Sequence, residues 1–294
     1  MKIISFDAAD GPRPGLVCGE NVLDLRAAGR GELPADVSGL LASETALARA
    51  AELHAASPSH SLLPRKQVDF LPPVPRPGKV VCLGLNYGDH AREGHAHVPD
   101  EPVIFSKAPT SVIGPGAPIC LPEASQKVDY EVELAFVIGQ KARLVPAQRA
   151  MHHVAGYTVV CDVSARDYQL EKPGGQWYLG KSFDTFCPLG PWIVTADAVT
   201  DPHDLALSCE VNGEVLQSSS TAQMIFKIPR IVEYVSRVLT LEPGDIVATG
   251  TPAGVGFART PPRFLQPGDI IRCHIEGIGT LENPVQSSPP CSEG

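Results

Sequence analysis

Three acidic residues are spaced so that they could hold a metal ion. A strand is predicted over residues 130–139, and its period-two alternation places Glu131 and Glu133 on one face. Two neighbouring buried carboxylates need a cation or hydrogen bonds, although two solvated glutamates on an edge strand are the commoner outcome of this spacing. Asp162, at the end of the apolar run GYTVVC, favours the site. Three oxygen ligands from two strands suit Mg²⁺ or Mn²⁺ better than zinc.

The loop over residues 84–97 carries a candidate acid–base pair. Its glycines permit tight turns, and on a helical turn Glu93 can orient His90, as a general base requires. The nearby His95 and His97 leave a zinc site with His90 as an alternative, and exposed loop histidines as a simpler one.

Two lysines and a glycine-rich turn could bind an anion. Lys107 and Lys181 both end apolar runs, where they could counter a substrate carboxylate or a developing enolate, or extend as ordinary surface lysines. Residues 249–256, TGTPAGVG, offer hydroxyl and backbone N–H groups. They lack both GxGxxG and the ending of a phosphate-binding P-loop, so a nucleotide site is not indicated.

Short apolar runs dominate the chain after residue 78, so we expect a mixed α+β fold that is predominantly β. Helices are predicted from an N-cap at Ser43 to His54, after Pro146, and over residues 228–239, where an apolar stripe of Ile231, Val232, Val235 and Val238 indicates core packing. The four prolines of residues 71–78 predict an extended linker. We therefore expect a small α+β domain over 1–72, a catalytic domain over 73–285 and a disordered tail over 286–294.

Composition narrows the classes of partner. The 294-residue chain has a formal charge of −9 and no cluster of basic residues, which argues against nucleic acid and anionic membranes and favours a small molecule. The eight cysteines form no CxxC pair, and several lie in apolar runs, as is typical of reduced thiols. No signal peptide or membrane span is evident, so a cytoplasmic protein is expected.

The chain resembles the fumarylacetoacetate hydrolase family. The strings that carry the resemblance occur in order between about residues 75 and 285: DYEVELAFVIG, GYTVVCDVSARDYQ, GKSFDTFCPLGP, VNGEVLQSSSTAQMIF and PGDIVATGTPAGVG. The C-terminal half is especially similar to the mammalian branch called fumarylacetoacetate hydrolase domain-containing protein 2. Residues 1–70 match less specifically.

The resemblance implies a fold and a set of roles. The fold would be the family's β-sandwich roll with a smaller N-terminal domain, assembled as a homodimer. The implied roles are metal ligation by Glu131, Glu133 and Asp162, a dyad of His90 and Glu93 on a closing loop, substrate contacts near the metal from Gln169 and Lys181, and a hold on the substrate carboxylate by Thr251.

These parts suggest chemistry on a small 2-oxo acid. A metal that chelates the 1-carboxylate and 2-oxo oxygens would stabilise an enolate at C3 as a Lewis acid. The leading hypothesis is a hydrolase or lyase that cleaves a C–C bond in a 2,4-dioxo acid of the acylpyruvate type, with Lys181 stabilising the oxyanion. Oxaloacetate tautomerisation or decarboxylation is the alternative. A catalytically silent binding protein with the same fold is the hypothesis from a different class.

Overall fold

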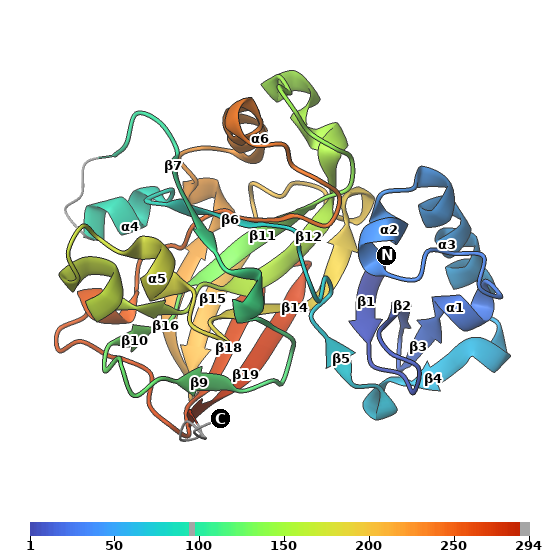
Figure 1. Ribbon diagram of the computed structural model, residues 1–294, viewed down its shortest axis with the longest axis horizontal. Helices are drawn as coiled ribbons and strands as arrows, with labels where there is room; N and C mark the ends of the chain where they lie inside the picture. The colour runs from blue at the N-terminus through green and yellow to red at the C-terminus, as the bar shows by residue number, and fades with distance from the viewer. Residues whose placement is uncertain (94–97, 289–294) are drawn as a thin grey trace.

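The computed structural model describes residues 1–93 and 98–288, and its largest element is one long mixed sheet (Figure 1). The strand order is β4-β3-β2-β1-β14-β12-β11-β17-β6-β7, with β5 beside β1 and β8 beside β14. The bounds along this path are β4 Leu62–Pro64, β3 Asn21–Asp24, β2 Arg13–Cys18, β1 Lys2–Phe6, β14 Cys187–Thr195, β12 Val154–Cys161, β11 Val132–Ile138, β17 Ile246–Ala248, β6 Val80–Gly84, β7 Val103–Lys107, β5 Phe70–Leu71 and β8 Val112–Ile113.

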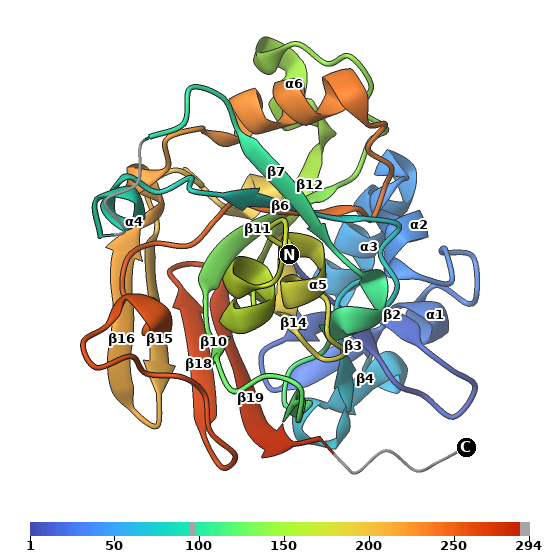
Figure 2. The ribbon, with the colours of Figure 1, turned by 60° about the vertical axis from the view of Figure 1, so that its left-hand side comes forward.

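A second sheet packs on the first, as in a sandwich (Figure 2). Its strand order is β16-β15-β18-β19-β9, with bounds β16 Glu214–Ser220, β15 Ala206–Val211, β18 Ile270–Ile275, β19 Gly279–Ser287 and β9 Ile119–Leu121. A short ribbon joins β10 Val128–Asp129 to β13 Ser164–Ala165. The prediction of a predominantly β fold with few helices is confirmed.

The strand β11 lies between β12 and β17, and every one of its residues is buried. Its alternation separates two cores: Leu134 and Phe136 pack with the second sheet, whereas Ala135 and Val137 pack toward the N-terminal helices. An interior strand has neighbours on both edges, so the edge-strand alternative for Glu131 and Glu133 is wrong.

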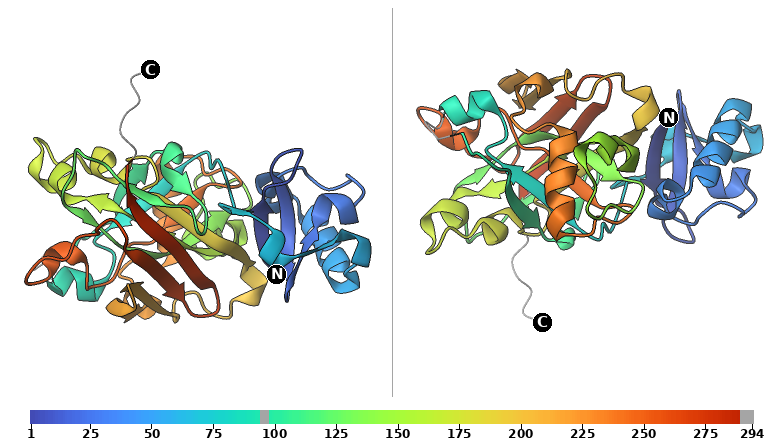
Figure 3. Two further views of the ribbon diagram at one scale, coloured as in Figure 1. Left: turned by 90° about the horizontal axis from the view of Figure 1, so that it is seen from below. Right: turned by 90° about the horizontal axis from the view of Figure 1, so that it is seen from above.

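The first 72 residues extend the long sheet at one end (Figures 1 and 3). The strand β1 pairs with β14, and the helices α1 Leu25–Ala28, α2 Val37–Leu41 and α3 Glu44–Ala56 cover this end. The predicted N-cap is confirmed, because Ser43 Oγ accepts a 3.1 Å hydrogen bond from Ala46 N. Residues 72–78 form no helix or strand, and the domain boundary that we propose lies there.

The longest helix of the catalytic part, α6, covers residues Ile228–Val238. Its buried stripe contains Ile231, Val232 and Val235, as predicted, but Val238 at the end of the helix is 76% exposed. The helix expected after Pro146 is a 3₁₀ segment, η4 Ala147–His153. The remaining short segments are α4 Gly88–Glu93, α5 Trp177–Lys181, the π-helical turn η5 Asp167–Glu171, and the 3₁₀ turns η1 Ser59–Ser61, η2 Arg65–Gln67, η3 Pro109–Ser111, η6 Ala196–Ala198, η7 Thr221–Gln223 and η8 Gly256–Ala258.

The sequence PGDI occurs twice, beginning at Pro243 and at Pro267. The two turns lead into β17 and β18, which lie in different sheets. Each needs its glycine, because Gly244 and Gly268 have φ values of 87° and 92°. The seven cysteines in the described part are free thiols, and Cys291 lies outside it. No helix among the described residues is long and apolar enough to cross a membrane.

Candidate metal centre and active site

The three predicted carboxylates meet where β11 begins and β12 ends. The antiparallel register pairs Val132 with Cys161, so the residues just outside this pair, Glu131 and Asp162, come side by side, and Asp162 N donates a 2.8 Å hydrogen bond to Glu131 O. One oxygen each from Glu131, Glu133 and Asp162 lies within 4.8 Å of the others, and all three side chains are buried. The structure therefore brings the predicted ligand set together.

Buried cations surround this cluster. Lys181 Nζ lies 2.7 Å from both Glu131 Oε2 and Asp162 Oδ2, and Arg166 Nη2 lies 2.5 Å from Glu131 Oε1. Burial alone would raise the pKa of Glu131, but the charges of Lys181 and Arg166 hold it at about 2. Burial alone would lower the pKa of Lys181, but Asp162 and Glu131 raise it to about 12. These groups are charged at neutral pH.

Among the described residues, Glu133 is the carboxylate of this cluster that forms no ion pair with a lysine or arginine. Its Oε2 accepts a 2.8 Å hydrogen bond from Gly250 N, yet burial, followed by the charges of Asp162 and Glu131, raises its pKa well above the usual range. If all were ionised, the four buried carboxylates described around the site, which include Asp129, would exceed the three buried cations Lys107, Arg166 and Lys181 by one negative charge, and the raised pKa of Glu133 reflects this excess. A hard divalent cation on these oxygen ligands would relieve this excess, so the residues fit Mg²⁺ or Mn²⁺.

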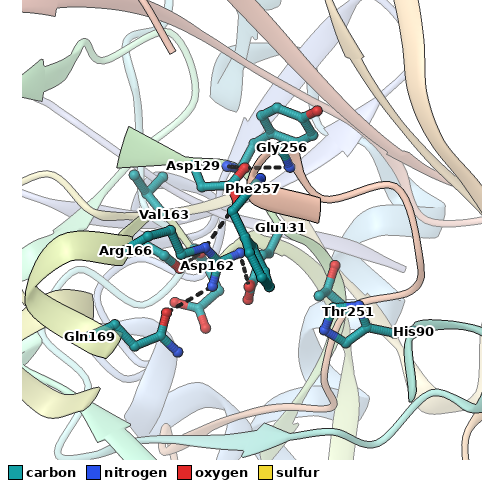
Figure 4. A network of polar contacts seen from close by, with 12 residues as sticks. His90, Asp129, Glu131, Asp162, Val163, Arg166, Gln169, Thr251, Gly256 and Phe257 are labelled. Carbon is teal, nitrogen blue, oxygen red and sulfur yellow. Dashed lines mark hydrogen bonds and ion pairs between the residues drawn. The ribbon is translucent and has the colours of Figure 1, made fainter. Parts of the chain in front are cut away.

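Arg166 and Asp129 are site residues that the sequence reasoning missed (Figure 4). Arg166 Nη1 donates to Gln169 Oε1 at 2.8 Å, and its Nε donates to Asp129 Oδ2 at 2.9 Å. Asp129 in turn accepts hydrogen bonds from the backbone N–H groups of Gly256 and Phe257. The pair thus ties the glycine-rich turn to a predicted metal ligand. Both residues stand inside family strings, DYEVE and SARDYQ, which was the available signal.

The predicted dyad lies on α4. His90 Nδ1 is 3.3 Å from Glu93 Oε2, and both Glu93 oxygens accept a hydrogen bond from Gly254 N, at 2.9 and 3.1 Å. At the other end of the helix, Asp89 Oδ2 accepts a 2.5 Å hydrogen bond from Ser219 Oγ of β16. The two acidic side chains therefore fasten α4 to two different elements, with the His90 ring at the pocket.

A pocket of about 110 Å³ opens beside the cluster. His90, Glu131, Arg166, Gln169, Lys181 and Thr251 provide its polar side. The apolar side consists of Leu83, Leu85, Phe105, Leu170, Trp177 and Phe257. In Figure 4, His90 and Thr251 lie together across from the side chains of Arg166 and Gln169. Of the residues expected to contact substrate, Gln169, Lys181 and Thr251 reach this pocket.

Lys107 does not reach the pocket. Its side chain is fully buried behind Asp162, with Nζ 2.6 Å from Asp162 Oδ1 and 3.1 Å from Val163 O. Lys107 instead contacts a predicted metal ligand, because β7 brings it to the back of the cluster, and its expected role in substrate binding stays a prediction. The zinc alternative depends on His95 and His97, which lie outside the described residues.

Known proteins resemble this chain in sequence and in fold. Residues 79–286 match the family described as fumarylacetoacetate (FAA) hydrolase C-terminal. Oxaloacetate tautomerase FAHD2A, mitochondrial, from Bos taurus is 50% identical over 97% of this chain and 91% of its own length, and the protein of that name from Homo sapiens is 49% identical with the same coverage. The structure of maleylpyruvate hydrolase from Sphingobium sp. SYK-6 in complex with manganese(II) ion and pyruvate is 33% identical, with a TM-score of 0.81 over 98% of this chain and 100% of that one. The chain belongs to the fumarylacetoacetate hydrolase family.

Proposed function

We propose that this enzyme is a metal-dependent tautomerase that interconverts the enol and keto forms of oxaloacetate. The observation that carries the proposal is the match of proteins named oxaloacetate tautomerase to 97% of this chain at about half identity, with the dyad and the carboxylates beside one pocket. The leading hypothesis from the sequence was C–C hydrolysis. The relatives support the alternative better.

The polar side of the pocket would bind and orient the substrate. Lys181 and Arg166 provide positive charge beside Glu131, where the 1-carboxylate and the 2-oxygen of the acid would lie. Gln169 is held by Arg166, so its amide nitrogen can donate a hydrogen bond to a carboxylate oxygen. Thr251 faces the pocket from the turn after β17, but its hydroxyl group donates to Val132 O at 3.0 Å, so a hydrogen bond from this hydroxyl to the substrate would replace that one. When bound at Glu131, Glu133 and Asp162, Mg²⁺ or Mn²⁺ would act as a Lewis acid toward the 2-oxygen and stabilise its negative charge.

The dyad would move the proton. Conversion of the enol to the keto form adds one proton at C3 and removes one from the 2-hydroxyl group. Glu93 holds His90 through Nδ1, which leaves Nε2 available to exchange a proton with C3. The hydrogen bonds from Gly254 N keep Glu93 in place during this exchange. The 2-hydroxyl proton would leave to water, with Lys181 stabilising the resulting charge.

Hydrolysis of 2,4-dioxo acids is the second candidate, favoured by the likeness to maleylpyruvate hydrolase. The dyad would then deprotonate a water molecule for attack on the distal carbonyl group, and Lys181 would stabilise the oxyanion. Decarboxylation of oxaloacetate uses the same site with loss of CO₂. A homodimer and a cytoplasmic location remain predictions; the vertebrate relatives are named as mitochondrial.

One set of assays separates these reactions. Freshly dissolved enol-oxaloacetate is mixed with Mg²⁺-loaded or Mn²⁺-loaded protein, and the loss of enol absorbance is followed against the uncatalysed rate. Acylpyruvate cleavage and CO₂ release are measured on the same samples. Tautomerisation that is accelerated, depends on metal and outpaces both other reactions supports the proposal. Cleavage or CO₂ release that outpaces tautomerisation refutes it, and failure of all three refutes an active enzyme for these acids.

A further inference from the structure

We propose that Trp177 determines substrate length, by closing the apolar end of the pocket to 2-oxo acids longer than about four carbons. The inference rests on the proposed function for the class of substrate, a 2-oxo acid whose carboxylate end lies beside Lys181. The geometry that carries it is the position of one indole ring relative to Lys181, Phe105 and Gly84.

Trp177 and Lys181 share one face of a short helix. They are the first and last residues of α5, four positions apart, so both side chains point toward the same pocket. Lys181 marks the carboxylate end through its contacts with Glu131 and Asp162. Four residues of helix rise about 6 Å, which sets the separation of the two side chains along the pocket.

An aromatic contact fixes the indole in this place. The Phe105 ring lies under the Lys181 ammonium, with 5.1 Å between Nζ and the ring centroid, and meets the Trp177 ring edge-on with centroids 5.5 Å apart. Edge-to-face contacts of this kind stabilise an aromatic pair beyond the burial of its surface. The wall of the pocket therefore runs without interruption from the ammonium through Phe105 to the indole.

Gly84 provides the seat for the indole. A Cβ atom at residue 84 would lie 2.6 Å from Trp177 Cζ3, which no real contact allows. The φ of Gly84 is not in the left-handed region, so the close approach of the ring, and not the backbone conformation, explains the glycine at this strand end. A glycine as the last residue of β6 therefore leaves room for the indole ring to pack against the backbone.

The interval between Lys181 and Trp177 suits a short acid. Beyond the 2-oxo carbon, a four-carbon acid adds two C–C bonds of about 1.5 Å each, so its far group reaches toward the indole. Each further methylene would press on a ring held between Phe105 and Gly84. A hydrophobic pocket discriminates by about 10–200-fold per misfitting methylene. Wild-type protein should therefore bind pyruvate at least about tenfold more tightly than 2-oxohexanoate.

Binding, rather than turnover, tests the inference. Calorimetry on Mn²⁺-loaded protein measures the affinities of oxalate, pyruvate, 2-oxobutyrate and 2-oxohexanoate. We expect Trp177→Ala, or Trp177→Leu if the alanine variant does not fold, to abolish the preference for pyruvate over 2-oxohexanoate and to leave oxalate affinity within about threefold. The matched control is Tyr178→Ala, since Tyr178 is the next residue of α5, is 52% exposed and does not line the pocket. This control should keep the wild-type ratio.

A double-mutant cycle tests the contact between Gly84 and the indole of Trp177. Gly84→Ala should change the pyruvate to 2-oxohexanoate ratio at least about threefold in the wild-type background and not at all in the Trp177→Ala background. The inference is overturned if wild-type protein binds both acids equally, if the ratio survives loss of the indole, or if Gly84→Ala acts without it. Because oxalate binding reports the metal site independently, these outcomes stay distinct from failure of the tautomerase assay.

Discussion

Replacement of Lys107 by methionine would show what this buried ammonium contributes to the metal centre. Methionine keeps much of the volume and removes the charge, which leaves Asp162 Oδ1 without its partner at 2.6 Å. Loss of one partner from a buried ion pair costs about 3–5 kcal/mol. We expect the metal-free variant to lose about that much free energy of unfolding, because both side chains are fully buried.

The same change should tighten metal binding. A cation on Asp162 would lie on the order of 5 Å from the ammonium, where each unit charge contributes about 3 kcal/mol of repulsion at an effective dielectric constant of 20. Looser positioning of Asp162 would offset part of this gain, since loss of a group that orients a metal ligand typically costs about 10–100-fold in affinity. The charge effect is the larger one, so we expect Mn²⁺ to bind at least about tenfold more tightly to Lys107→Met.

The charge balance also predicts a cost for the substrate. With Lys107, the buried groups and a divalent cation leave one net positive charge, and without it they leave none. A dianionic acid should therefore show a raised KM in the variant, with a smaller change in kcat. A direct substrate contact from Lys107, as expected from the sequence, would instead raise KM without changing Mn²⁺ affinity.

Urea unfolding with and without Mn²⁺ and calorimetric titration measure these effects. The matched control is Lys79→Met, which removes a different lysine–aspartate pair, Lys79 Nζ to Asp245 Oδ2 at 2.7 Å, away from the pocket. Its loss of stability should be the same with and without Mn²⁺. Equal stabilisation of wild type and Lys107→Met by Mn²⁺ would refute the reasoning.

Three further changes test other parts of the site. Because the pKa of Glu133 is raised, Mn²⁺ must displace a proton there, so affinity should fall as pH falls, and calorimetry in buffers of different ionisation enthalpy should detect proton release in wild type and much less in Glu133→Gln. His90→Ala should keep wild-type Mn²⁺ affinity and lower kcat by about 10²–10⁴-fold; unchanged turnover would exclude His90 as the acid–base group. Ser219→Ala removes a charge-assisted hydrogen bond to Asp89 worth about 1.5–3 kcal/mol, so hydrogen exchange of α4 should accelerate and kcat should fall; unchanged exchange would show that α4 is held elsewhere.

The local patterns of the sequence were sufficient for much of the fold. Alternation over residues 130–139 assigned the two faces of β11 correctly, and the cap at Ser43 placed the start of α3. Both depend on interactions within a few residues, so they can be recognised without tertiary information. The predicted buried stripe of α6 was wrong only at Val238. How far along a helix the burial extends depends on the segments packed against it, which the sequence pattern does not show.

These local patterns could not predict which distant segments of the chain pair with each other. The strand β1 joins β14 across more than 180 residues, and β11 has its edges paired with β12 and β17 and its two faces covered by two different cores. The spacing of Glu131 and Glu133 is the same on an edge strand as on an interior one. Only the segments that surround the strand in the tertiary structure, including α5 with Lys181 and the residue before η5, Arg166, determine whether these carboxylates meet water or a cation.

The candidate metal ligands could therefore be named from the sequence, whereas the charges around them are determined by the tertiary structure. Glu131, Glu133 and Asp162 could be named from residue type, position on predicted strands and family strings. The different positions of Lys107 and Lys181 could not be predicted from the sequence, because both residues end apolar runs in the same way. Lys107 lies behind Asp162 and Lys181 faces the pocket, and this difference arises only from where β7 and α5 place the two ammonium groups around the cluster.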